Sequence, residues 1–591
     1  MSPPVPQPTA TPGARLFQFL KFQPRALALL REPYTKRQAV TDVLAGITVG
    51  LIALPLALAL GVASMPPGSA TPFPAPAIGI FTAIIGGFIV SLLGGSRVQI
   101  AGPTAAFVAV VLLIVQQHGF DGLLLATIMA GVMLMVMGFS GLGTLIKFIP
   151  YPVTSGFTTG IAVTLMVGQA AEFAGIRSAT PAPPEFIDKL PWLATHLSGV
   201  NLSTLLIALG SAAFIIAWPK YRDRLHAGRV PGAIIAMVVS AVLVAWLDRD
   251  QSLGVATVGS RFGPDAIPHG LPPVTWPAIS LERIRSLLGP AFTIAMLGAI
   301  ESLLSAVVAD GLINDRHDSN TELIAQGLAN IACPLFCGLP VTGAIARTSA
   351  NVKAGGRTPV AGMVHALTLL LIVLFFAPYA RFVPMGAIAA VLVVVAFRMG
   401  EWHELTRLAK MPRSDAVVLL ATCGLTVVFD LVVAVEVGMM LAAVLFIKRM
   451  AETTEISEVT TRDELETPEQ LAHGKDIPDG VVVYRIFGPF FFGAAEKMED
   501  ALLRAGTLPR VLILRMQLVP AMDATALNAL ESIVERMLAA GGTVILSGPH
   551  RQPLDMMVRA GFIGKLGRPN ICAHFDDALT RAREVLAAGS T

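Results

Sequence analysis

Two apolar stretches of this chain are interrupted by helix-breaking residues, and each also carries an arginine. They are residues 94–107, with Arg97, Gly102 and Pro103, and residues 338–351, with Pro340, Gly343 and Arg347. Each predicts a short extended piece and then a helix, which opens at Gly102-Pro103 in the first stretch and near Thr342 in the second. Irregular backbone inside a bilayer is stable only where protein or a water-filled cavity covers it. The chain is therefore predicted to fold around these two interrupted segments.

The composition is typical of a polytopic α-helical membrane protein in a lipid bilayer. Of the 591 residues, 54% are hydrophobic and 14% are charged, and the formal net charge of +3 is too small to indicate a nucleic-acid partner. Apolar runs between polar loops predict fourteen membrane segments, several shorter than the ~20 residues of a full span. They are 39–63, 77–94, 102–117, 122–139, 152–171, 201–218, 231–247, 287–309, 322–337, 342–352, 359–377, 384–398, 414–429 and 431–448.

Charged loops predict the orientation of the chain. Loops 219–230 and 398–413 are dense in Lys and Arg, which are Lys220, Arg222, Arg224 and Arg229 in the first and Arg398, Arg407, Lys410 and Arg413 in the second. Loops of this kind stay in the cytoplasm. An even number of spans then places both termini on the cytoplasmic side of the inner (plasma) membrane, with residues 1–38 as a cytoplasmic N-terminal segment.

The interrupted segments are third and tenth in the predicted order, which favours two inverted halves of seven segments each. The transmembrane domain is predicted over 39–449, and the acid-rich residues 450–480 are predicted to form a linker. Strands alternating with helices over 481–591 predict a small cytoplasmic α/β domain with a largely parallel sheet. Its expected strands are 481–487, 511–516 and 543–547, and its expected helices are 525–540 and 575–587.

A helix that begins inside a bilayer favours an anion at its first residue. Its first backbone N–H groups are free, and the positive end of its dipole lies there. Arg347 adds a positive charge near the start of the second such helix, and an ionisable residue in a membrane segment is a functional candidate. We therefore predict an anion site between the interrupted segments. The alternative interpretation is a kinked helix in which Arg347 pairs with a carboxylate for packing.

Glu301 is the strongest other ionisable candidate, because it lies at the centre of the apolar span 287–309. A buried carboxylate must be paired or protonated. We interpret Glu301 as a coupling group that binds a proton or a cation, or as the structural partner of Arg347. Ser305, one turn later, shares its face of the helix. The sequence has no evident catalytic constellation, phosphate-binding loop or metal-ligand set, so we expect neither an enzyme nor a metal or organic cofactor.

Several motifs together resemble those of one transporter family. They are Ala45–Gly50 followed by Leu54-Pro55, Gly102-Pro103-Thr104, Leu297–Asn330, Pro340–Pro359 and Met522–Thr525. The chain resembles the sulfate permease (SulP) family of anion transporters with a C-terminal STAS domain. The resemblance implies seven plus seven inverted segments divided into a core and a gate domain, elevator-like alternating access, and a homodimer.

The resemblance also implies which residues bind substrate. By position they are Leu56, Leu60, Thr104, Ala105, Gly343, Ala344, Ile345 and Arg347. Glu301 and Ser305 correspond to an Asp and a Thr that help to hold sodium in sodium-coupled bicarbonate members. Because Glu and Ser stand here instead, the resemblance fits proton symport or simple anion exchange at least as well as sodium coupling. The expected coupling ion, if there is one, is H⁺ or Na⁺.

The STAS domain resembles bacterial anti-sigma-factor antagonists, in which a Ser or Thr before a helix can be phosphorylated. Asp523 and Thr525 occupy that region, which implies a regulatory loop and a cytoplasmic protein partner. Asp523 is also placed to cap the following helix. The predicted function is secondary active transport of sulfate, bicarbonate or a C4-dicarboxylate. Two alternatives stay open: a membrane-tethered STAS sensor, and a nucleobase permease of similar fold.

Overall fold

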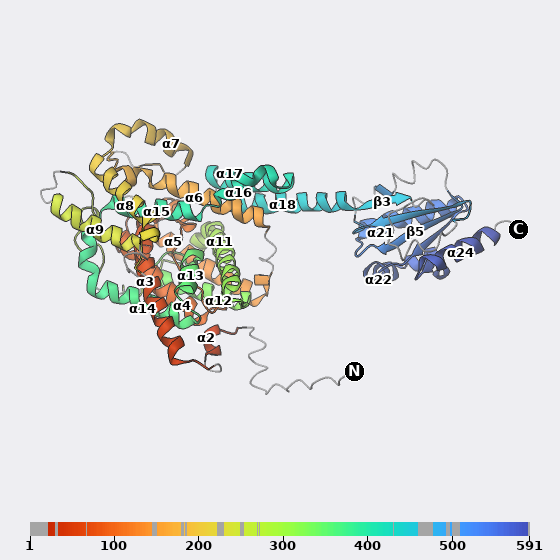
Figure 1. The fold of residues 1–591 in the computed structure, drawn as a ribbon, viewed down its shortest axis with the longest axis horizontal. Coiled ribbons are helices and arrows are strands. Elements are labelled where there is room, and N and C mark those ends of the chain that lie inside the picture. The colour runs from red at the N-terminus through yellow and green to blue at the C-terminus, as the bar shows by residue number, and fades with distance from the viewer. Residues whose placement is uncertain are drawn as a thin grey trace. The chain divides into compact units, whose positions relative to one another are not determined.

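The computed structural model describes residues 22–29, 33–66, 68–144, 150–178, 182–183, 186–221, 230–248, 253–268, 270, 272–429, 431–458, 477–491, 497–498 and 509–588. The chain divides into two compact units, Met1–Met439 and Met440–Thr591. The first unit is helical, and the second is built on a β-sheet (Figure 1).

The helices of the first unit follow the predicted spans closely. The described helices are α2 (Arg25–Ala28), α3 (Lys36–Ser64), α4 (Ala75–Leu93), α5 (Phe107–Phe139), α6 (Tyr151–Ala174), α7 (Phe186–Thr195), α8 (Leu202–Tyr221), α9 (Gly232–Leu247), α10 (Val258–Phe262), α11 (Leu281–Ile313), α12 (Ser319–Leu335), α13 (Ile345–Lys353), α14 (Pro359–Phe376), α15 (Met385–Met399), α16 (Trp402–Arg407), α17 (Arg413–Val428) and α18 (Leu431–Thr453). Helix α18 continues into the second unit. The predicted third and fourth spans are the two parts of α5, which bends at Gly119, where φ is 71°.

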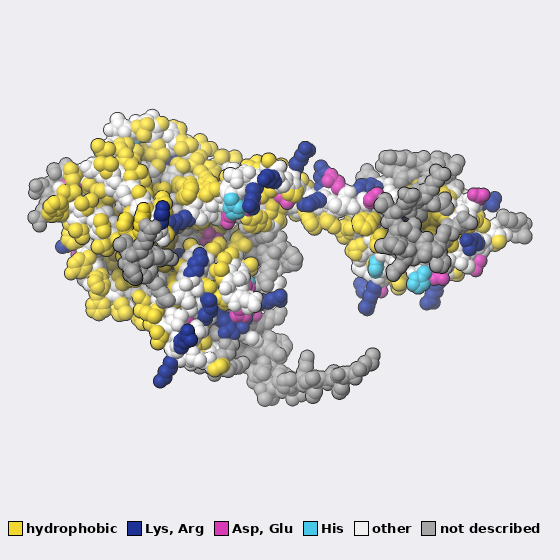
Figure 2. Space-filling model, viewed as in Figure 1, with side chains coloured by type: hydrophobic (Ala, Val, Ile, Leu, Met, Phe, Trp, Pro, Cys, Tyr) yellow, Lys and Arg dark blue, Asp and Glu magenta, His cyan; other side chains and the backbone are white. Residues whose placement is uncertain are grey.

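Seven helical segments in the described part are long and apolar enough to cross a membrane by themselves. They are Lys36–Ser64, Ala75–Leu93, Phe107–Phe139, Leu202–Tyr221, Leu281–Ile313, Pro359–Phe382 and Met385–Lys410. The other predicted spans fall on shorter or less apolar helices. Hydrophobic side chains cover much of the visible face of the helical unit (Figure 2), as expected for a surface in contact with lipid.

Packing separates the membrane helices into two groups. The core group contains α3, α4, α5, α11, α12, α13 and α14, which contact one another extensively. The gate group contains α6, α8, α9, α15 and α17. Helix α3 connects the groups through its contacts with α9 and α15. Among the described residues no hydrogen bond joins α3 to either of those two helices, and buried apolar residues of all three helices belong to one core cluster.

Both interrupted segments contain an extended piece, and these pieces pair with each other. Strand β1 (Ala101–Gly102) runs antiparallel to β2 (Thr342–Gly343), with Ala101 opposite Gly343. The predicted extended pieces are thus confirmed, but the predicted helix starts are too early. Helix α5 begins at Phe107 and α13 begins at Ile345, because the backbone before each helix is used for strand pairing and a turn.

Polar side chains satisfy the irregular backbone around this strand pair. The Asn330 amide of α12 donates to the Val341 carbonyl (2.8 Å) and accepts from the Val341 N–H (2.9 Å). The Thr82 hydroxyl accepts from the Leu339 N–H at 2.7 Å. The buried Glu322 carboxylate accepts from the Gly95 N–H at 2.9 Å. Each side chain takes the place that water or a neighbouring strand would fill in a soluble protein.

The second unit contains a five-stranded sheet in the order β3-β4-β5-β6-β7. Its strands are β3 (Glu455–Glu458), β4 (Val481–Phe487), β5 (Val511–Leu518), β6 (Thr543–Ser547) and β7 (Ile571–Cys572). Strands β4 to β7 are parallel, and β3 is antiparallel to β4. The largely parallel sheet is therefore confirmed. Strand β3 lies inside the predicted linker 450–480, and residues 459–476 of that linker lie outside the described part.

Helices cover both faces of this sheet. They are α21 (Ala524–Ala539), α22 (Arg551–Arg559), α23 (Phe562–Leu566) and α24 (Phe575–Ala588). Alternate residues of each strand enter two separate apolar cores, as the two-residue period of a strand requires. Leu512 and Leu514 of β5 enter the core that contains residues of α21, and Ile513 enters the core that contains residues of α24.

Replacing Asn330 by leucine should destabilise the helical unit. The substitution leaves the buried N–H and C=O of Val341 without partners, and each unpaired group costs about 1–3 kcal/mol. We expect the unfolding midpoint of the purified full-length protein in detergent to fall by several degrees. Gln116→Leu is the control, because the Gln116 amide on α5 is exposed and has no hydrogen bond among the described residues. Equal midpoints for Asn330→Leu and the control would contradict this account.

Candidate functional site

The candidate site lies where the two interrupted segments meet. Helix α13 begins after Ala344, whose backbone is extended and whose side chain forms no capping hydrogen bond. Helix α5 begins after Ala106, which also lacks a side-chain cap. The strand pair joins the segments directly before both helices, and the Ala344 N–H donates to the Ile100 carbonyl at 2.9 Å. Two helix N-termini therefore lie close together without side-chain acceptors for their first N–H groups.

Arg347 links the two segments. Its side chain is buried (2% exposed), and Nη2 donates to the Pro103 carbonyl. Its Nη1 is buried and has no hydrogen-bond partner among the described residues. An unpaired buried guanidinium N–H is unfavourable, so this atom is suited to an anionic acceptor.

Glycine is required at Gly102 beside Arg347. An added Cβ would lie 2.5 Å from Arg347 Nη1, and the φ of Gly102 is 154°. A larger residue would therefore displace the guanidinium and strain the backbone.

Glu301 of α11 reaches the start of α5. Its Oε2 accepts from the Thr104 hydroxyl at 2.8 Å, and both side chains are only half-buried. Glu301 interacts electrostatically with Arg347, but the described ion pairs do not include a direct contact between them. The structure thus brings Glu301, Thr104 and Arg347 to one region without the structural ion pair that was the alternative interpretation.

Ser305 has a different neighbour. Its buried hydroxyl donates to the Thr348 hydroxyl of α13 at 3.2 Å, and that same oxygen accepts from the Ile100 N–H at 3.0 Å. Ser305 therefore supports the paired strands, and no hydrogen bond joins it to Glu301 in the described part of the chain. The roles of Glu301 and Ser305 in coupling stay predictions.

Ser302 is a structural residue of the site that the sequence analysis missed. Its hydroxyl accepts from the Gly343 N–H (3.0 Å) and hydrogen-bonds the Thr342 hydroxyl (2.7 Å). Thr342 in turn donates to the Gly298 carbonyl at 3.0 Å. The Gln99 amide donates to the Ser302 carbonyl at 3.2 Å. Polar residues inside otherwise apolar segments were the available signal for Ser302, Thr342 and Gln99.

The remaining predicted substrate-binding residues lie on the interrupted segments and on α3. Ala105 and Ala344 are small and buried, whereas Ile345 is 41% exposed. Leu60 of α3 is buried and Leu56 is half-buried within the apolar core. Helix α3 continues through Pro55 without a break. Whether these residues bind substrate stays a prediction.

Asp523 caps α21 in the second unit. Its carboxylate accepts from the Ala526 N–H at 2.8 Å, which confirms the capping role. The amide of Gln552 holds the preceding residue through the Met522 N–H (2.9 Å) and carbonyl (3.0 Å). Thr525 is exposed. A regulatory role for Asp523 and Thr525 stays a prediction.

Two family models match this chain. The model of the sulfate permease family matches residues 40–422, and the model of the STAS domain matches residues 475–578. This chain belongs to the sulfate permease family. The transmembrane fold with a C-terminal STAS domain is thereby confirmed, as is the expectation that the chain is not an enzyme, because the family is one of transporters.

The relatives of this chain are named for different substrates. YvdB of Bacillus subtilis (strain 168), provisionally named a sulfate transporter, is 38% identical over 545 residues, covering 92% of this chain and 98% of YvdB. The bicarbonate transporter BicA of Picosynechococcus sp. is 31% identical over 523 residues, covering 86% of this chain and 88% of BicA. The solved structure of the murine anion transporter Solute Carrier 26 family member A9 has a TM-score of 0.82 at 19% identity, covering 98% of this chain and 96% of that one. The last likeness concerns the fold alone.

Gly343→Ala should disrupt the strand pair. An added Cβ would lie 1.9 Å from Gln99 Nε2, so the amide that holds the Ser302 carbonyl must move. Overpacking of this kind costs about 1–3 kcal/mol. We expect a lower unfolding midpoint for the full-length protein in detergent.

The control for this prediction is Gly289→Ala. Gly289 lies within α11, where an added Cβ meets no atom within 4 Å. Alanine favours a helix over glycine, so this variant should unfold at the wild-type midpoint or slightly above it. A Gly343→Ala variant as stable as Gly289→Ala would contradict the described packing.

Proposed function

We propose that this protein is a secondary active transporter that binds a small anion between the first turns of α5 and α13. The observation that carries the proposal is Arg347, a buried cation with one guanidinium N–H unpaired among the described residues, at the meeting point of the two helix starts. The two helix dipoles and the guanidinium would attract an anion together. Arg347 is the one full positive charge in this set. The site would therefore hold the anion weakly enough to release it on the other side of the membrane.

Small side chains favour recognition by the backbone. Ala105, Gly343 and Ala344 carry no long side chain that would cover the helix starts, so an oxyanion could approach the backbone there. These residues offer no amide side chain that could read a nucleobase, which weighs against the nucleobase permease alternative. Relatives named for sulfate and for bicarbonate make these two anions the first candidates, with a C4-dicarboxylate as the third.

We further propose that Glu301 couples transport to a proton. Ionised Glu301 accepts from Thr104 and places a negative charge near the anion. Protonation removes that charge, so the anion and the proton would favour each other's binding. A sodium ion is the alternative, but the Ser305 hydroxyl is engaged with Thr348 and does not complete a ligand set with Glu301.

The distribution of hydrogen bonds is consistent with elevator-like movement of the core group as one body against the gate group. The hydrogen bonds around the strand pair join α4, α11, α12 and α13, all within the core group. The contacts of α3 with α9 and α15 are apolar and so can slide. We propose a homodimer in the inner membrane with both termini in the cytoplasm, where the STAS domain would meet a protein partner.

Uptake into proteoliposomes tests the proposed function. Labelled sulfate, bicarbonate and fumarate are each offered with an inward proton gradient, an inward sodium gradient or no gradient. We expect gradient-driven uptake of at least one anion above that of protein-free liposomes. Absence of uptake of all three would contradict the proposal and favour the alternative of a membrane-tethered STAS sensor.

Glu301→Gln should abolish the stimulation of uptake by the driving gradient while anion binding is largely kept, because glutamine cannot exchange a proton or hold a cation by charge. Glu282→Gln is the matched control, since Glu282 is an exposed carboxylate in the first turn of the same helix. The measurement is initial uptake rate against external pH and sodium. Unchanged pH and sodium dependence in Glu301→Gln would remove Glu301 from the coupling mechanism.

A further inference from the structure

A second site is suggested by a cavity between the core and gate groups. Its volume is about 550 Å³, and it lies between α3, α9 and the end of α14 with the following helix η3 (Ala377–Phe382). Leu54 and Leu58 of α3 form one wall, and Met237 and Ala241 of α9 form the opposite wall. None of the residues proposed to bind the anion lines this cavity.

The lining is almost entirely apolar. The lining residues are Leu, Ile, Val, Ala, Met, Phe and Pro, and the hydroxyl of Tyr379 is their only polar side-chain group. A buried water needs two to four polar partners, so this cavity is poorly suited to water. It is equally unsuited to an inorganic anion. A hydrocarbon chain is the ligand that such walls accept.

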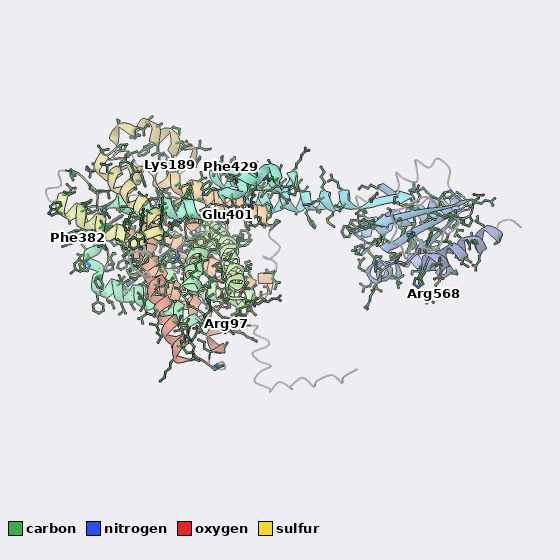
Figure 3. All side chains as sticks on the ribbon, viewed as in Figure 1. Arg97, Lys189, Phe382, Glu401, Phe429 and Arg568 are labelled. Atoms are coloured by element: carbon green, nitrogen blue, oxygen red, sulfur yellow. The ribbon has the colours of Figure 1, made fainter. Side chains whose placement is uncertain are left out.

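A cation lies at the rim of the cavity. Phe382 of η3 is a lining residue, labelled in Figure 3, and the Arg381 guanidinium is 4.7 Å from the centroid of its ring. Arg381 is exposed, and the described residues include no carboxylate paired with it. Tyr379 is also exposed beside it. Aromatic residues and a basic residue at the end of an apolar helix are typical of the membrane interface, where lipid headgroups lie.

We propose that this cavity binds one acyl chain of a phospholipid whose anionic headgroup lies against Arg381. The apolar walls accept the chain and exclude water. The Arg381 guanidinium, which has no carboxylate partner in the described part of the chain, supplies the complementary charge for a phosphate-bearing headgroup. The helices around the cavity are in contact with a bilayer, so phospholipid is the most abundant amphiphile available to it. Binding of this lipid does not depend on the proposed transport.

The position of the cavity predicts a consequence for movement. Its walls come from α3 and α14 of the core group and from α9 of the gate group. A bound acyl chain would therefore contact both groups where the α3–α9 connection is apolar. It would change how easily the two groups move relative to each other.

Native mass spectrometry of the purified full-length protein tests the proposal. The protein is titrated in detergent with phosphatidylglycerol or with phosphatidylcholine of the same acyl chains. We expect wild type to retain phosphatidylglycerol at least tenfold more tightly than phosphatidylcholine. Ala241→Trp, which fills the cavity from α9, should lower phosphatidylglycerol affinity at least tenfold. Arg381→Gln should lower it to the level of phosphatidylcholine.

Matched controls separate the cavity from general lipid contact. Val239→Trp adds the same side chain to an exposed position of α9 that does not line the cavity, and Arg285→Gln removes an exposed arginine from α11. Both should bind phosphatidylglycerol as wild type does. Equal phosphatidylglycerol binding in Ala241→Trp and Val239→Trp would overturn the proposal, as would equal binding in Arg381→Gln and Arg285→Gln.

A measurement on wild type keeps the test independent of variant folding. Phosphatidylglycerol with a photoreactive group at the end of its acyl chain is crosslinked to the protein in vesicles, and the labelled peptides are identified. We expect label on the cavity walls from α3 and α9. Label confined to helices that do not line the cavity would overturn the proposal.

Discussion

The structure depends on one constraint, which is that irregular backbone inside a helical bundle must find hydrogen-bond partners without water. The pairing of β1 with β2 meets part of this requirement, since each interrupted segment supplies partners for the other. Side chains meet the rest. Asn330 pairs both backbone groups of Val341, Ser302 accepts from Gly343, and Thr348 accepts from Ile100. These side chains come from the helices packed around the strand pair, so the packing of the core group and the strand pair stabilise each other.

The same constraint creates the candidate site. Because the extended residues are used in strand pairing, α13 begins shortly after the strand pair and α5 begins after a further turn, both without side-chain caps. The Nη1 group of Arg347 is buried beside these helix starts and has no hydrogen-bond partner among the described residues. Glu301, held by Thr104, brings a titratable charge to the same place. An anion bound there would complete the hydrogen bonding that the fold itself leaves open.

Local sequence patterns predicted the segments of the fold but not the contacts among them. Apolar runs and helix breakers placed the membrane helices within a few residues, and two strands of the second unit, Val481–Phe487 and Thr543–Ser547, lie as predicted. Helix starts near Gly102 and Thr342 were misplaced, because they depend on pairing between two distant segments. The bond between Thr104 and Glu301 joins residues 197 positions apart, and no local pattern encodes it. Ser302 and Asn330 were missed because their partners, Gly343 and Val341, belong to the second interrupted segment and not to their own helices.

The central claim is that Arg347 and the two helix starts bind an anion, and equilibrium binding tests it most directly. Labelled sulfate and bicarbonate would be titrated into full-length protein in nanodiscs, for wild type and for Arg347→Gln, with the unfolding midpoint measured on the same samples. A charge-assisted hydrogen bond contributes about 1.5–3 kcal/mol, so the account predicts at least about a tenfold loss of affinity in Arg347→Gln. Wild-type affinity in a folded Arg347→Gln protein would contradict it.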